Sequence, residues 1–152
     1  MSKVARVKFA DYQSSITKAL DLIGAGAQLP QDGLIIIKPN LINSSPPPVT
    51  TSVAAAEAVY NYCKVHTKAE ITIGEGCGTG KTSDVFTVLG YTEMAKRYGL
   101  KLIDFNESET VVLENKNAFQ LKQFHMPRIV QDAFVISLPV LKDHRGVSVV
   151  CR

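Results

Sequence analysis

The chain has 152 residues, 45% of them hydrophobic and 20% charged, which is the balance of a globular protein and not of a disordered one. The formal net charge of +3 is too small and too dispersed to indicate a nucleic-acid partner. No apolar run reaches the ~18 residues of a membrane span, no signal peptide opens the chain and the three cysteines form no paired pattern, so we expect one cytoplasmic domain over residues 1–152 with no membrane partner.

Strands and helices are expected to alternate along the chain, since short apolar or alternating runs are separated by longer segments with helical periodicity. In order, the expected elements are a strand at 4–9, a helix from a cap at Asp11 to Gly24 and Gly26, a strand at 34–37, a helix at 52–66 capped by Thr50 or Thr51, a strand at 70–74, a helix at 84–98 broken at Gly90, a strand at 100–104, an edge or hairpin strand at 119–124, a helical turn at 127–132 and a strand at 133–138. Residues 106–118 are polar and weakly patterned.

The strand at 34–37 is continuously apolar, which is typical of a strand buried on both faces, and we expect the strands at 71–74 and 134–138 to be buried as well. Strands of this kind that alternate with helices predict an α/β fold with a mostly parallel sheet. We expect helices on both faces of that sheet, in a Rossmann-like three-layer sandwich.

The segments that follow the three buried strands are the most polar and unusual in the sequence. They read KPNLINSSPPPVTT from residue 38, GEGCGTGKTSD from residue 74 and PVLKDHR from residue 139. Ligands of open parallel sheets collect beyond the carboxyl ends of the strands. We therefore expect the three loops to meet at one rim and to form a positively biased hollow there.

The glycine-rich loop follows a strand and precedes a helix, as a phosphate-binding loop does. The nucleotide-binding spacing requires a glycine where Glu75 stands, so that motif fails as written. A looser hypothesis is that the loop turns backbone N–H groups toward an anion, and the alternative is a flexible loop without a ligand. The candidate ligand-binding residues in this loop are Gly76, Gly78, Gly80, Lys81 and Thr82.

Further candidates lie in the other two loops. Pro39 forces Lys38 into an extended conformation, so Lys38 is either a rim cation or a lysine whose charge reaches past the strand end. Beyond the last apolar strand, cationic groups could clamp an acidic ligand, and the alternative is a solvated charged loop. The candidates that bind ligand are Lys38, Asn40, Thr50, Lys142 and Arg145, and the candidates that move protons are His144 and Glu75.

A metal site can be drawn from Cys77, His144, Glu75 and Asp143, but nothing in their spacing requires one, and no metal ligand is assigned.

Several segments, in this order and spacing, carry a family resemblance. They are IKPNL at 37–41, PPVTT at 47–51, GEG at 74–76, GY at 90–91, YGLKLID at 98–104 and VISLPVLKDH at 135–144. Together they resemble the domain of unknown function 362 family over roughly residues 30–146.

The resemblance implies an α/β domain of a kind often joined to ferredoxin-type modules with four-iron clusters, and it implies no settled substrate. The chain has no ferredoxin cysteine pattern, so any cluster is expected on a ferredoxin-type partner or another segment. Family domains continue past the Lys-x-His motif, which implies that this chain is truncated at its C-terminal end relative to the family.

Three functions remain open on the sequence. The first is an α/β domain that binds a small anionic metabolite or cofactor at its rim, with or without catalysis, in an iron–sulfur redox setting. The second is a non-enzymatic interaction or scaffold module for a redox partner. The third is nucleotide binding through the imperfect glycine-rich loop.

Overall fold

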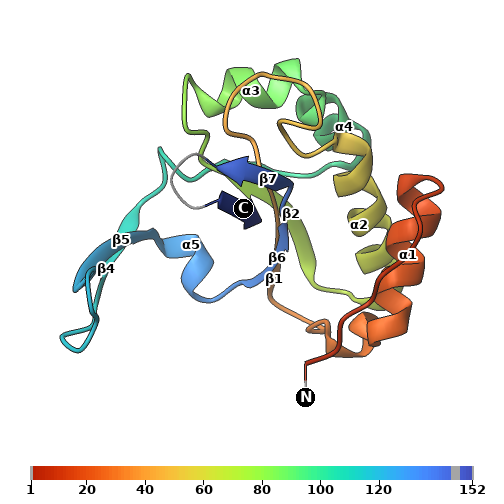
Figure 1. Cartoon of the computed structure of the whole chain (residues 1–152), viewed down its shortest axis with the longest axis horizontal. Coiled ribbons are helices and arrows are strands. Elements are labelled where there is room, and N and C mark those ends of the chain that lie inside the picture. Colours follow the sequence, from red (N-terminus) through yellow and green to blue (C-terminus); the bar gives the residue numbers. More distant parts are fainter. Residues whose placement is uncertain (1, 145–147, 152) are drawn as a thin grey trace.

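A four-stranded parallel sheet forms the centre of the protein, as a computed structural model shows (Figure 1). The structure describes residues 2–144 and 148–151, with side chains through Lys142. The strand order is β3-β2-β1-β6, and all three pairings are parallel. The strands are β1 (Leu34–Pro39), β2 (Glu70–Glu75), β3 (Leu102–Asp104) and β6 (Phe134–Leu138). The expected α/β class is confirmed.

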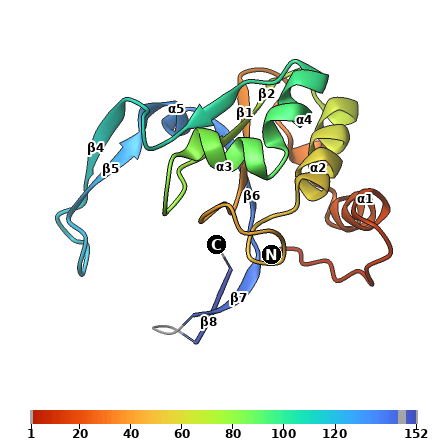
Figure 2. The ribbon, with the colours of Figure 1, turned by 90° about the horizontal axis from the view of Figure 1, so that it is seen from above.

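The helices and two small hairpins surround this sheet. The helices are α1 (Tyr12–Ile23), the 3-10 turn η1 (Ala25–Gln28), α2 (Val53–His66), α3 (Thr82–Val88), α4 (Tyr91–Tyr98) and α5 (Arg128–Gln131). The hairpins pair β4 (Thr110–Glu114) with β5 (Gln123–Pro127) and β7 (Leu141–His144) with β8 (Ser148–Cys151). In both views α1, α2 and α4 lie on one side of the sheet, and the β4–β5 hairpin with α5 lies on the other (Figures 1 and 2). The Rossmann-like three-layer arrangement stays a prediction.

Strand β1 occupies the middle of the sheet and is buried on both of its faces. Ile35 and Ile37 belong to the hydrophobic core with α2, while Ile36, which points to the opposite face, is also fully buried. Burial of one such side chain stabilises a fold by about 1.5–3 kcal/mol. The carboxyl end of β1, which carries the candidate site, is thus fixed by the best-packed strand.

The ends of the helices follow local sequence signals. The Asp11 side chain accepts a hydrogen bond from the N–H of Ser14 at the start of α1, and Gly24 ends this helix in the left-handed conformation, at φ 68°. Gly90, at φ 85°, separates α3 from α4. At α2 the expected cap was wrong, because Ser52 makes the capping hydrogen bond while the hydroxyl of Thr50 donates to the carbonyl of Ser45.

Two expected strands do not stand where the pattern placed them. Residues 4–9 form no strand, because no neighbouring strand pairs with this segment among the described residues, and alternation alone supplies no partner. The polar segment 106–118 contains β4, whose Thr-Val-Val-Leu run pairs with β5. The strand expected at 119–124 begins only at Gln123, because the earlier residues form the hairpin connection.

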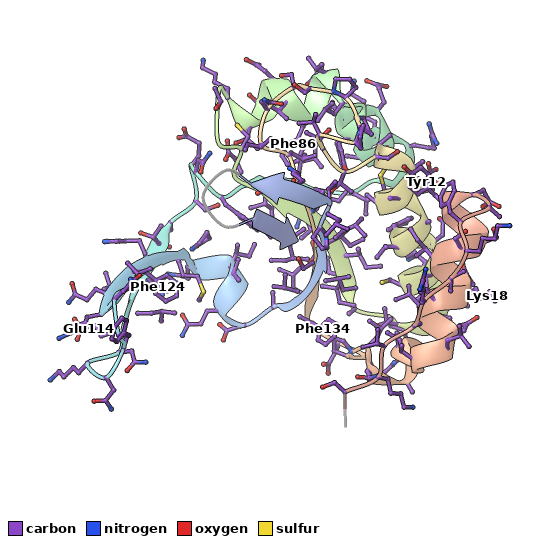
Figure 3. All side chains as sticks on the ribbon, in the orientation of Figure 1. Tyr12, Lys18, Phe86, Glu114, Phe124 and Phe134 are labelled. Atoms are coloured by element: carbon purple, nitrogen blue, oxygen red, sulfur yellow. The ribbon has the colours of Figure 1, made fainter. Side chains whose placement is uncertain are left out.

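Strand β6 was expected to be buried on both faces, and this was wrong. It lies at the edge of the described sheet beside β1, and its Phe134 side chain remains 41% exposed (Figure 3). An apolar run of this length is compatible with either a central or an edge position, so composition alone could not distinguish them. No helix in the described part of the chain is long and apolar enough to cross a bilayer.

Candidate functional site

The loops that follow β1, β2 and β6 meet at one edge of the sheet, as expected from their parallel direction. They surround a hollow of about 380 Å³. Its walls come from the ends of β1, β2 and β6 and from the loops after β1 and β2, and they consist of Lys38, Asn40, Leu41, Ile42, Glu75, Gly76, Gly78 and Ser137. Four of the predicted ligand-binding residues and one predicted proton-moving residue thus lie around a single hollow.

Glu75 is the buried acid of this hollow, with 5% of its surface exposed. The ammonium of Lys38 donates to Glu75 Oε2 over 3.1 Å, and the N–H of Leu41 donates to the same oxygen over 3.4 Å. The N–H of Gly76 donates to Oε1 over 2.9 Å. One carboxylate therefore ties the end of β1 to the start of the glycine-rich loop.

Lys38 is the cation of the hollow wall. Its side chain is 35% exposed, so the ammonium can contact Glu75 and solute in the hollow at the same time. The parallel register places Lys38 opposite Ser137 of β6. Because paired residues of neighbouring strands point to the same face, the lysine and the serine hydroxyl approach the hollow from the same side.

Lys142 reaches the same rim from β7. Its ammonium donates a hydrogen bond to the side-chain carbonyl of Asn40, a residue 102 positions away in the sequence. The N–H of Asn40 donates to Thr51 Oγ1 over 2.9 Å, and that hydroxyl donates to the carbonyl of Leu138 over 2.8 Å. These contacts join the ends of β1 and β6 and place a second cation at the rim.

The backbone of Thr51 is also held in place by a hydrogen bond from Tyr91. The hydroxyl of Tyr91, which is fully buried, donates to the carbonyl of Thr51 over 2.9 Å. Burial raises the pKa of Tyr91 far above its ordinary value, because the charged phenolate would lose its hydration there. Tyr91 therefore stays a neutral hydrogen-bond donor, and its buried hydrogen bond stabilises the position of Thr51 between the ends of β1 and β6.

The glycine-rich loop packs closely against its surroundings. A Cβ at Gly76 would lie 2.6 Å from Asn106 Oδ1, and a Cβ at Gly78 would lie 3.2 Å from Ile42 Cγ1. The N–H of Thr79 donates to the carbonyl of Ile42 over 3.0 Å. Gly78 thus lets this loop lie against the β1 loop, and Gly76 lets it lie against Asn106, which follows β3.

Asp104 and Asn106 are functional-site neighbours that the sequence analysis missed. Thr82 Oγ1 donates to Asp104 Oδ1 over 2.8 Å, and the Asn106 amide donates to the carbonyl of Cys77 over 2.9 Å. Asp104 ends β3, which is a fourth strand whose carboxyl end reaches this edge. That position at a strand end was the signal that could have found it.

The remaining predicted ligand-binding residues lie outside the hollow or outside the described side chains. Thr82 is buried and donates to Asp104, Thr50 is buried within the β1 loop, and Lys81 is exposed at the start of α3. Gly80 takes φ 86° in the glycine-rich loop, and a Cβ there would meet open space. The side chain of His144 and all of Arg145 lie outside the described residues, so their roles stay predictions.

The described cysteines do not fit an iron–sulfur cluster, which requires several converging thiolates. Cys63 belongs to α2 and lies inside the core, where burial raises the pKa of its thiol to about 11. The Cys77 thiol faces the carbonyl oxygens of Thr79 and Gly80. Among the described residues, no group of three or more His, Cys, Asp or Glu side chains is placed to hold a metal ion.

Comparison with known proteins gives one match. The family described as "Domain of unknown function (DUF362)" matches residues 35–151, which include the whole central sheet except Leu34, the first residue of β1. No curated protein and no solved structure matches the chain.

Proposed function

The chain belongs to the DUF362 family of unknown function, and from the geometry of its rim we propose that it binds a small anionic ligand or cofactor in the hollow at the carboxyl ends of β1, β2 and β6. The observation that carries the proposal is the convergence of Lys38 and Lys142 with loop residues of β2 at one edge. Lys38 contacts the buried carboxylate of Glu75, while Lys142 contacts the neutral side chain of Asn40, so we expect the rim to keep a positive charge for an incoming anion.

The arrangement supplies more than charge. Asn40 and Ser137 offer neutral polar groups for orienting the ligand, and Leu41 and Ile42 exclude water from part of the wall. Glu75 is the proposed proton-moving group on this wall, together with His144 of β7. The positions of these groups support binding first, with catalysis as an extension of the same site.

The redox setting is also a proposal, and it depends only on the family resemblance. A cluster would be held by a ferredoxin-type partner or by another segment, because the described cysteines do not fit one. The cytoplasmic location belongs to the same proposal.

Binding of simple anions tests the proposal directly. Phosphate, citrate and acetate should raise the thermal midpoint of the purified chain, because a ligand of the folded state stabilises it by mass action. Titration calorimetry should then show that Lys38→Met and Lys142→Met each weaken binding by about tenfold or more, since a charged hydrogen bond contributes about 1.5–3 kcal/mol.

Lys68→Met is the matched control, since Lys68 is an exposed lysine near the amino end of β2, away from the rim. Unchanged affinity in both rim variants would remove the two lysines from the site. A midpoint raised by ATP or GTP at far lower concentration than by phosphate would favour the nucleotide function instead. A chain that binds none of these anions would favour the scaffold function.

A further inference from the structure

A second hollow, of about 390 Å³, lies next to the rim, and its lining includes Thr51 and Leu138 of the contacts described above. Its walls are mainly apolar and come from three separate parts of the chain. Phe9 and Tyr12 belong to the N-terminal segment and α1, Pro48 belongs to the β1 loop, and Leu138 and Leu141 belong to β6 and β7. Large apolar side chains with few convergent polar groups are the usual lining of a ligand pocket.

The two hollows share a wall, in which adjacent residues of the same strand line different hollows. Ser137 lines the polar hollow, and its neighbour Leu138 lines the apolar one. Asn40 lines the polar hollow, and its N–H donates to Thr51, which lines the apolar one. The end of the sheet therefore separates a polar space from an apolar space across the thickness of its own backbone.

Lys142 lies where the two spaces adjoin. Its ammonium binds Asn40 of the shared wall, and the preceding residue, Leu141, lines the apolar hollow. Successive residues of a strand point to opposite faces, so β7 presents an apolar group to one hollow and a cation toward the other. This complementarity suits a ligand that has an anionic head beside an apolar body.

Apolar surface at the mouth of the second hollow remains open to solvent. Phe9 is 62% exposed and Leu141 is 72% exposed, and the Phe9 ring meets the Tyr12 ring edge to face at a centroid distance of 5.2 Å. Coverage of these side chains by a ligand would remove apolar surface from water, which is favourable. A small polar ligand bound at the rim would leave these apolar side chains exposed to water.

We propose that the ligand of this protein is an amphiphilic anion, such as an acyl carboxylate of six or more carbons, with its head at the rim lysines and its body in the apolar hollow. This inference rests on the proposed anion site and names the class of ligand for it. The body must pass over the joined ends of β1 and β6 to reach the apolar hollow, so the shortest carboxylates should not fill both spaces.

A chain-length series tests the inference on the full chain. Acetate, butyrate, hexanoate and octanoate carry the same head and differ only in methylenes, and burial of each methylene should tighten binding by about fourfold. Hexanoate should therefore bind at least about tenfold more tightly than acetate, because two buried methylenes already give about 16-fold. Hexan-1-ol, which has the body without the charge, should bind far more weakly than hexanoate.

Two variants locate the apolar part of the site. Phe9→Ser and Leu141→Ser each remove an exposed side chain, and each should lower the ratio of hexanoate affinity to acetate affinity by about threefold or more. Val65→Ser is the matched control, since Val65 is 80% exposed and lies near the end of α2, outside the lining of this hollow. The control should keep the wild-type ratio.

Each outcome has a distinct meaning. Affinity that rises with chain length and falls in the two variants supports the inference. Affinity for acetate and phosphate that depends on Lys38 but not on chain length overturns the inference and leaves the anion site standing. Equal binding of hexan-1-ol and hexanoate overturns it as well, because the head would then contribute nothing. Failure of every anion in the series to bind removes the proposed function together with the inference.

Discussion

Substitution of Glu75 is the sharpest test of how the rim is held together. The change Glu75→Ala removes the acceptor for two backbone N–H groups, of Leu41 and Gly76, and for the ammonium of Lys38. Leu41 is buried, so its N–H cannot turn to water without movement of the loop. A buried donor that loses its partner costs about 1–3 kcal/mol, while the partly exposed Lys38 can be solvated at little cost.

These values give a loss of about 2–4 kcal/mol in the free energy of unfolding for Glu75→Ala. Lys38→Met should cost less, about 1–2 kcal/mol, because the carboxylate keeps its two backbone donors. The double variant should lose no more than Glu75→Ala alone, since Lys38 contributes to stability through Glu75. Urea denaturation with a common slope measures all three values.

Glu70→Ala provides the matched control on the same strand. Glu70 pairs with Lys101 over 2.9 Å, but both side chains are exposed, so its removal should cost less than about 1 kcal/mol. A loss for Glu75→Ala as small as this, or losses for Lys38→Met and Glu75→Ala that simply add, would refute the view that one carboxylate organises the two loops.

Two further predictions concern the core. A Cβ at Gly74 would lie 2.5 Å from Phe105 Cζ and 3.0 Å from Ile36 Cγ2, so Gly74→Ala should cost about 1–3 kcal/mol in urea unfolding, and Phe105→Leu in the same chain should restore part of that loss. No restoration would show that the ring is not the obstacle. Burial raises the pKa of the Cys63 thiol from 9.0 to about 11, so the unfolded chain loses this proton first and stability should fall as the pH rises from about 9 to about 11. Cys63→Ala should abolish that part of the fall, and identical pH profiles for the two proteins would contradict the assignment.

Local signals predicted the helices and the central strand well. Asp11 and Gly24 mark the ends of α1 because capping and the left-handed conformation are decided by a few neighbouring residues. The meeting of the loops at one rim also followed from sequence, since parallel strands send their carboxyl ends to the same edge.

Features that depend on contacts between residues far apart in the chain could not be predicted from the sequence. The hairpin of β4 and β5 exists because Val111 lies opposite Met126 and Leu113 lies opposite Phe124, pairs that no local pattern specifies. The hairpin projects away from the central sheet, as the labelled Glu114 and Phe124 show (Figure 3). Ser137 was overlooked for the same reason, because its place opposite Lys38 follows from the register of β6 against β1.

The alternation along β1 has a consequence for how this protein can change over time. Ile37 faces the core and the next residue, Lys38, faces the hollow, so adjacent residues of β1 serve stability and ligand binding respectively. Deletion of one residue within Leu34–Ile37 would exchange the two faces, and would turn a lysine inward and an isoleucine toward the ligand. Insertions in the long segment between Asn40 and Thr50 carry no such penalty. Evolutionary variation should therefore occur mainly as insertions and deletions in the loop, while the number of residues in the strand stays constant.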